Sequence, residues 1–444
     1  MGEAGESKGV FGVGRVTRFY LPLLLQAFSQ SLTYPLVAGI VTHGPDGVNA
    51  LTAFSQGQLV MFIIGAFGLG LITTGLVFAK TWYGYVSFRR LNALMMGSLL
   101  ALQAVAAVPP FSDWIFCGLF ALPPDLAESA RITLMGSLVM NAAFFLRNVP
   151  MVVLFLNYDS EKANRATLVR IGATLAFAAT FPRLGLTGSA WGLFALTSGI
   201  VLETALTWVW ARPYVRRLRG MRETVSGRAE PAAGEIVSLT IEQFRFTLPL
   251  SLGGFLLTLS PLVIAAFVGR SADAADMLAI HYVTIGIANP VAFAALRMQT
   301  VAIQFPPEHS RDRRLLAYAI AAGAVLGLVP FLFSTPLVGD WYFGVYQNVP
   351  PRILDTARTA IGAYSFICII QAVRGRVEGL VALKKCPSAI MASQMTYTAT
   401  LVAALAVMMP LGVAGWKMAV ISITVAPVAA AMVLYVALLR VKSK

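Results

Sequence analysis

Two stretches of the chain decide its fold: RFYLPLLLQAFSQSLTYPLVAGIV at residues 18–41 and RFTLPLSLGGFLLTLSPLVIAAFV at residues 245–268. Each is an apolar segment long enough to cross about 30 Å of hydrocarbon as an α-helix. The two are also copies of each other, since ten of the 24 aligned positions are identical at a constant offset of 227 residues. These features predict a helical, membrane-embedded fold with an internal repeat.

The repeat extends beyond these two segments. Three further residues are identical at the same offset: Leu184, Gly185 and Gly188 align with Leu411, Gly412 and Gly415. Both copies begin on the same side of the membrane, so the repeat is parallel, as in many secondary transporters whose substrate sites lie between the repeats. We predict an amino-terminal six-helix half at 1–210, a basic cytoplasmic linker at 211–242 and a carboxy-terminal six-helix half at 243–444.

The composition excludes an ordinary soluble domain. Of 444 residues, 57% are hydrophobic and 12% charged, against roughly 25% charged in soluble proteins. Apolar segments too long for barrel strands recur along the chain, and helices are the structure that satisfies their backbone groups in lipid. The sequence thus predicts an all-α polytopic protein with twelve transmembrane spans, at about 17–41, 50–79, 91–108, 131–157, 166–182, 187–210, 243–269, 275–305, 315–335, 356–383, 387–409 and 413–439.

The basic residues set the expected orientation. With the amino terminus inside, 25 of the 34 Lys and Arg lie on cytoplasmic stretches or in the cytoplasmic part of a span, five lie on the outer side and four more lie in or near spans. This bias predicts that both termini are cytoplasmic. The net charge of +14 is spread over short loops without interleaved aromatic residues, which argues against nucleic acid as a partner. The Ala, Gly and Arg-rich composition favours a multi-pass protein of the bacterial inner (plasma) membrane, and we expect a monomer.

No motif of a soluble enzyme is present. The chain lacks a P-loop, an HExxH and a GxSxG, and its three histidines and three cysteines are scattered without the spacing of metal ligands. We therefore expect no catalytic residues, no cofactor and no metal site.

Charged residues inside spans carry the functional information, because each costs roughly 2.5–3.5 kcal/mol near the bilayer centre. Arg147 lies close to the middle of the fourth span, and the offset places it on Arg374 in the tenth. These two arginines are predicted to face a cavity between the halves and bind an anion. The alternative is that both are structural anchors, with Glu378 one turn beyond Arg374 as an i,i+4 ion-pair partner.

Five further residues complete the predicted substrate site. Arg297 is a third basic residue within a span, although it could also reach the cytoplasmic interface. Gln26 and Gln30 share one face of the first helix, where helix–helix hydrogen bonding is the alternative role. Asn148 and Gln371 are weaker candidates beside the two central arginines.

Prolines mark the first helix of each half. Pro22 and Pro249 occupy equivalent positions, and proline removes a backbone donor and kinks a helix interior. Bends or broken turns are therefore expected in these two helices.

The repeat, the prolines and the twelve spans resemble the multidrug and toxin extrusion (MATE) type of flippase-like transporter superfamily. Within it, several stretches resemble the progressive ankylosis protein family. They are YSF at 364–366, Val373-Arg374, Gly379, Leu383-Lys384-Lys385, Pro410-Leu411-Gly412-Val413 with Gly415, Phe246 with Pro249-Leu250, Phe267-Val268-Gly269-Arg270 and Gly75-Leu76-Val77-Phe78. This resemblance implies export or control of pyrophosphate, nucleotides or other polyanionic metabolites. Among charged positions it carries over only Arg374, Lys384 and Lys385, and the long polar carboxyl tail of animal members is missing.

Three functions remain open. The first is a secondary-type transporter or exporter of small polyanions (pyrophosphate, nucleotide or organic anion) that works by alternating access between the halves. The second is a MATE-like antiporter of organic cations or drugs, or a flippase for a lipid-linked precursor. The cation antiporter needs a membrane carboxylate, and the first and seventh spans contain none. The third is a membrane regulator that transports nothing, against which the cost of buried arginines argues.

Overall fold

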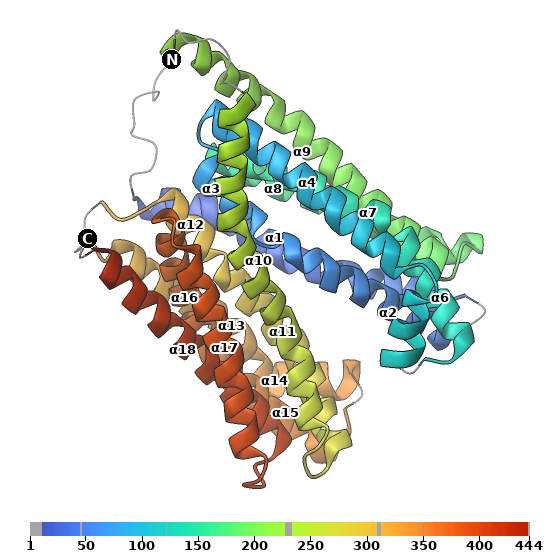
Figure 1. Ribbon diagram of the computed structural model, residues 1–444. Coiled ribbons are helices and arrows are strands. Elements are labelled where there is room, and N and C mark those ends of the chain that lie inside the picture. Colours follow the sequence, from blue (N-terminus) through green and yellow to red (C-terminus); the bar gives the residue numbers. More distant parts are fainter. Residues whose placement is uncertain are drawn as a thin grey trace. The chain divides into compact units, whose positions relative to one another are not determined.

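The computed structural model describes residues 11–44, 47–120, 122–226, 233–308, 312–347 and 349–442, and these residues form helices and no strands (Figure 1). The first part comprises α1 (Val13–Thr42), α2 (Gly47–Gly65), η1 (Ala66–Gly68), α3 (Leu71–Phe78), α4 (Trp82–Ala106), α5 (Phe111–Asp113), η2 (Trp114–Leu119), α6 (Pro124–Gly136), α7 (Leu138–Leu156), α8 (Ser160–Thr180), η3 (Pro182–Leu184) and α9 (Ser189–Ser226). The second comprises α10 (Ala233–Val268), α11 (Ala274–Leu296), α12 (Met298–Gln304), α13 (Arg314–Ser334), α14 (Pro336–Gly339), η4 (Asp340–Tyr346), α15 (Pro351–Ala363), η5 (Tyr364–Phe366), α16 (Ile367–Leu383), α17 (Pro387–Met408) and α18 (Gly415–Lys442).

Each of the twelve predicted spans corresponds to one helix or to one interrupted helix in this series. Judged by length and apolarity alone, eight helices of the described chain could cross a membrane, or nine if the bent α4 and α5–η2 pair is one span. The span at α1 falls outside that set, and so do two others, at α8 and at α15–α16. Both contain arginines within their apolar stretch, which lowers their hydropathy, and both supply residues to the clusters described below.

Local irregularities of the helices recur at the offset found in the sequence. The π-helical turns η2 and η4, the breaks at Gly70 and Arg297, and the left-handed residues Tyr158 with Lys385 and Gly185 with Gly412 form equivalent pairs. Breaks and turns of this kind are not visible in a hydropathy profile. Their repetition extends the similarity of the two halves from sequence to backbone geometry.

The chain folds into two compact units, which differ from the sequence halves in one respect. The N-unit consists of residues 29–251, and the C-unit of residues 1–28 with 252–444. Helix α1 thus begins in the C-unit and continues into the N-unit, whereas α10 begins in the N-unit and continues into the C-unit. The division at 1–210, 211–242 and 243–444 remains a prediction about the repeat.

A polar stripe holds the first part of α10 within the N-unit. Its members recur on one helix face and are Thr240, Gln243, Thr247 and Ser251. The hydroxyls of Thr247 and Thr74 lie 2.7 Å apart, and the Gln243 amide donates to the carbonyl of Gly84 at 3.1 Å. In the C-unit, the start of α1 is held by the buried Tyr20, whose hydroxyl donates to the carbonyl of Ala294 at 3.2 Å.

No broken turn occurs at the two prolines. Helices α1 and α10 run without interruption past Pro22 and Pro249, and the alternative, a bend within a continuous helix, stays a prediction.

Close backbone approach in the C-unit sets the position of α16. A methyl group at Gly379 would lie 2.5 Å from the carbonyl oxygen of Gln299 and 2.9 Å from the side chain of Ala302, so glycine lets α16 and α12 touch. Gly375 approaches the carbonyl of Leu296 in the same way. The break between α11 and α12 is therefore packed directly on α16.

Gly379→Val is expected to destabilise the protein by roughly 1–3 kcal/mol, because the branched side chain must push α12 away from α16. The measurement is the melting temperature of the purified protein in detergent. Gly286→Ala is the control, since nothing lies within 4 Å of a methyl group at that position. Equal melting temperatures of the two variants would show that α12 and α16 do not meet as described.

Candidate functional site

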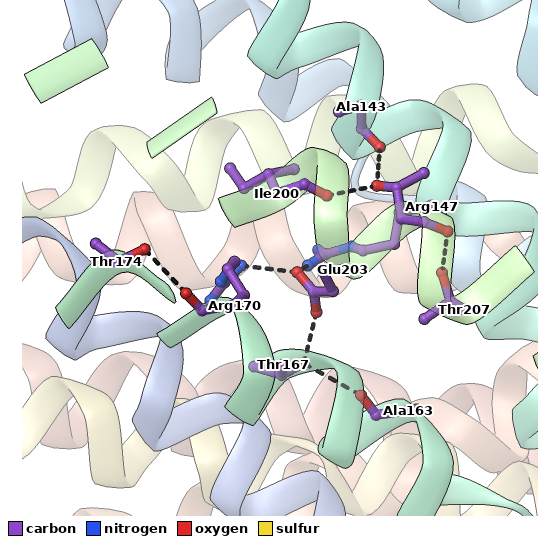
Figure 2. A network of polar contacts seen from close by, with 10 residues as sticks. Ala143, Arg147, Ala163, Thr167, Arg170, Thr174, Ile200, Glu203 and Thr207 are labelled. Carbon is purple, nitrogen blue, oxygen red and sulfur yellow. Dashed lines mark hydrogen bonds and ion pairs between the residues drawn. The ribbon is translucent and has the colours of Figure 1, made fainter. Parts of the chain in front are cut away.

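A buried carboxylate pairs with two arginines within the N-unit. Glu203, on α9, is fully buried and accepts hydrogen bonds from Nη1 of Arg147 at 2.7 Å and Nη1 of Arg170 at 3.0 Å. Its other oxygen accepts a hydrogen bond from the hydroxyl of Thr167 at 2.5 Å. Figure 2 shows these side chains converging from α7, α8 and α9. Both carboxylate oxygens of Glu203 are thus occupied.

The surrounding helices hold this cluster in place. The hydroxyl of Thr204 donates to the carbonyl of Ala143 at 3.1 Å, and the indole of Trp208 donates to the carbonyl of Leu146 at 3.1 Å. These two bonds fix α9 against α7 in the turn before Arg147. Because both side-chain donors of α9 bind backbone carbonyls of α7, they fix the register of the two helices.

The N-unit cluster contains two positive groups and one negative group, and it carries a formal charge of +1. The Arg147 side chain is 12% exposed and also lies over the ring of Phe144, at 5.1 Å from Cζ to the ring centroid. Its Nε has no hydrogen-bond partner among the described residues. Ion pairs buried this deeply are costly to break, because one partner would be left charged in an apolar interior.

A second arginine cluster lies within the C-unit, on α16. The Arg374 side chain is only 2% exposed, and its Cζ lies 5.2 Å from the ring centroid of Tyr397 on α17. Its Nη1 is 3.4 Å from the amide oxygen of Gln371. Its Nη2 is 3.9 Å from Glu378, too far for a hydrogen bond. Nε and Nη2 of Arg374 have no hydrogen-bond partner among the described residues.

The two clusters occupy equivalent positions in the repeat. At the offset of 227, Arg147, Thr167, Arg170 and Glu203 correspond to Arg374, Gln394, Tyr397 and Ala430. The helices agree, since α9 packs on α7 and α8, and α18 packs on α16 and α17. The second cluster therefore has an arginine in the same place, an aromatic ring where the first has a second arginine, and no carboxylate at the position of Glu203.

The structure brings together some of the predicted site residues. Gln371 contacts Arg374, and Asn148 lies next to Arg147 in the chain with its amide 3.4 Å from that of Asn92. Arg297 is half-buried at the break between α11 and α12. Gln26 is buried in the part of α1 that belongs to the C-unit, and the side chain of Gln30 lies outside the described residues.

Three residues of these clusters, Glu203, Arg170 and Tyr397, are not among the predicted site residues, and none of them carries a motif. The offset could have found two of them, because it relates Arg170 to Tyr397 beside the pair of central arginines. It leads from Glu203 to Ala430, so it gives no signal for the carboxylate. Within the described residues, no group of three or more His, Cys, Asp or Glu could hold a metal ion.

The fold has known counterparts, although no family model and no curated protein matches the sequence. A eukaryotic MATE transporter, AtDTX14, superposes with a TM-score of 0.68 at 13% identity, over 96% of this chain and 95% of its own. An outward-facing multidrug resistance MATE family transporter of the MOP superfamily matches with a TM-score of 0.69 at 17% identity, over 99% of both chains. A MOP superfamily transporter from Pyrococcus furiosus Vc1 matches with a TM-score of 0.69 at 17% identity, over 97% of this chain and 96% of its own. That transporter is described as having a binding pocket of reverse polarity, which suggests a different function.

These likenesses confirm the predicted fold class: the chain has the all-helical fold of MATE transporters. The resemblance to progressive ankylosis proteins stays a prediction, since neither a family model nor a curated relative supports it.

Proposed function

We propose that this protein is a secondary-type transporter that moves small polyanions across the membrane by alternating access between its two six-helix halves. The observation that carries the proposal is Arg374, a buried guanidinium whose Nε and Nη2 have no hydrogen-bond partner in the part of the chain that the structure describes. A guanidinium offers parallel donors that match two oxygens of a phosphate or carboxylate. An anion of that class would supply the missing partners. Pyrophosphate, nucleotides and organic acids all belong to it.

The contrast between the clusters supports Arg374 over Arg147 as the primary anion contact. Glu203 already binds Nη1 of Arg147, so an anion there would have to compete with a fixed carboxylate. At Arg374 the equivalent position holds Ala430. The MOP transporter with a pocket of reverse polarity supports the idea that this fold can serve ligands of different charge. We further propose a monomer in the bacterial inner membrane, as the sequence predicts.

The competing function is a MATE-like antiporter of organic cations, which the multidrug neighbours with the same fold favour. Glu378 is the feature that could serve it, because its Oε2 has no hydrogen-bond partner among the described residues. Transport of an organic cation that is indifferent to Arg374 would support that alternative.

Flux measurements in proteoliposomes separate the two. Labelled pyrophosphate, ATP and citrate are compared with the organic cation tetraphenylphosphonium. Arg374→Ala is expected to lower anion flux about tenfold to a hundredfold, because it removes charge-assisted hydrogen bonds worth roughly 1.5–3 kcal/mol. Arg374→Lys should restore part of it, since an ammonium keeps the charge but not the planar fork.

The control for this experiment is Arg440→Ala, which removes an exposed arginine from the last turn of α18. It should leave anion flux unchanged. Wild-type protein that transports the cation and none of the three anions would refute the proposed function.

A further inference from the structure

The C-unit cluster contains a buried carboxylate as well as a buried arginine, and each has atoms without a hydrogen-bond partner. Oε1 of Glu378 accepts a hydrogen bond from the side-chain amide of Gln299 at 3.3 Å. Oε2 lies 3.9 Å from Nη2 of Arg374 and has no hydrogen-bond partner among the described residues. The side chain is 7% exposed, whereas Glu203 makes three short bonds. A buried carboxylate oxygen without a hydrogen bond is unusual, and here it lies beside an arginine whose Nε and Nη2 also lack one.

Arg374 lies one turn from Glu378 on the same helix, with 3.9 Å between Nη2 and Oε2. Arg297 is a second basic residue nearby in the fold, half-buried at the break between α11 and α12 that packs on α16. The other elements packed on α16 present different groups. Helix α12 presents the amide of Gln299, and α17 presents the ring of Tyr397 to Arg374. The titratable groups Asp312 and Tyr435 act on Arg376 instead. His281 on α11 and Tyr318 on α13 make their contacts with Tyr282 and with Thr17, respectively.

One arginine cannot compensate both a bound polyanion and an ionised Glu378. Two like charges about 4 Å apart in a site of effective dielectric about 20 repel enough to lower affinity roughly a hundredfold to a thousandfold. A proton on Oε2 removes that repulsion. Protonation also gives Oε2 an O–H group, which can donate a hydrogen bond to the anion.

We infer that Glu378 takes up a proton when the anion binds at Arg374, so that the protein carries its anion together with a proton. The O–H bond forms on Oε2 with a proton from water on the side where the anion enters. It breaks on the opposite side, where the proton returns to water as the anion leaves. No redox step or further reactant is involved. This inference rests on the proposed anion transport and adds its coupling ion.

A pH gradient across proteoliposomes tests the coupling, with pyrophosphate as the probe. In wild-type protein, pyrophosphate should accumulate in the alkaline compartment, and its affinity should rise by up to about tenfold per pH unit toward acid, as linkage to one proton requires. Glu378→Gln should keep exchange of labelled for unlabelled pyrophosphate but lose both the accumulation and the pH dependence of binding. Glu378→Asp should keep both, and Glu235→Gln, which removes an exposed carboxylate on α10, should behave as wild type.

The outcomes distinguish this inference from the proposed function. Absence of any pyrophosphate flux or exchange, with no flux of ATP or citrate either, refutes the transport proposal itself. Flux that ignores the pH gradient, that follows a sodium gradient instead, or that remains pH-driven in Glu378→Gln overturns the inference and leaves anion transport standing. If Glu378→Gln does not fold, the inference is tested by the pH dependence of pyrophosphate binding in wild type and Glu378→Asp. An affinity that does not change with pH refutes the inference.

Discussion

Ala430→Glu is expected to abolish anion flux while the protein stays folded. Ala430 is fully buried on α18, and its carbonyl accepts a hydrogen bond from Ser393 on α17 at 2.8 Å. The repeat places it where the N-unit has Glu203. A carboxylate there should pair with Arg374 as Glu203 pairs with Arg147. Hydrogen bonds to charged groups are worth roughly 1.5–3 kcal/mol each, and a carboxylate can form two with one guanidinium. The built-in anion should therefore displace the substrate and lower flux by about a hundredfold or more.

The matched control is Ala430→Gln, which adds nearly the same volume without the charge. It should retain substantially more flux than Ala430→Glu, since both variants crowd the site but only one compensates the arginine. Flux and binding are measured as for Arg374→Ala, with gel filtration to verify folding. Equal loss in both variants would mean that volume, and not charge, explains the effect. Unchanged flux in Ala430→Glu would separate the anion site from Arg374.

Glu203→Ala is expected to destabilise the N-unit by roughly 3–5 kcal/mol, the cost of leaving buried charge without its partner. The two arginines that Glu203 holds lie only 12% and 3% exposed at their side chains. Without it they would repel each other in an apolar interior. The melting temperature in detergent should fall far more than for the exposed pair Glu161 and Arg165 when Glu161 is replaced by alanine, since exposed pairs contribute about 0–1 kcal/mol.

Replacing the whole cluster tests the reason for that loss. The triple variant Glu203→Leu, Arg147→Met and Arg170→Met should recover most of the stability, because a buried ion cluster can often be exchanged for apolar residues of similar volume. It should also retain anion flux if Arg374 is the primary contact. A triple variant that is stable but transports no anion would show that Arg147 or Arg170 binds substrate directly.

The sequence alone was sufficient for the fold class and for the equivalence of Arg147 and Arg374 in the repeat. The apolar segments follow from the lipid environment, and the offset of 227 follows from the internal repeat. Both signals extend over whole spans, so they are visible in the sequence. The partners of the arginines could not be obtained this way. Glu203 lies 56 residues from Arg147 in the chain, and the offset leads to Ala430, where the second half has no carboxylate. Which charges meet depends on the packing of α7, α8 and α9.

Glu378 illustrates the same limit at short range. The i,i+4 spacing predicts an ion pair with Arg374, and the structure has one, with 3.9 Å between Nη2 and Oε2. The spacing does not predict that the other carboxylate oxygen turns toward Gln299 on α12. Helix spacing fixes which residues share a face, but the direction of a side chain depends on the donors that neighbouring helices offer.

Equilibrium binding of labelled ligands to the purified protein tests the central claim most directly. Labelled pyrophosphate and labelled tetraphenylphosphonium are titrated against wild type, Arg374→Ala and Arg440→Ala. The account predicts saturable pyrophosphate binding in wild type and Arg440→Ala, its loss in Arg374→Ala, and no saturable binding of the cation. Saturable binding of the cation that persists in Arg374→Ala, with no binding of pyrophosphate by any of the three proteins, would contradict it.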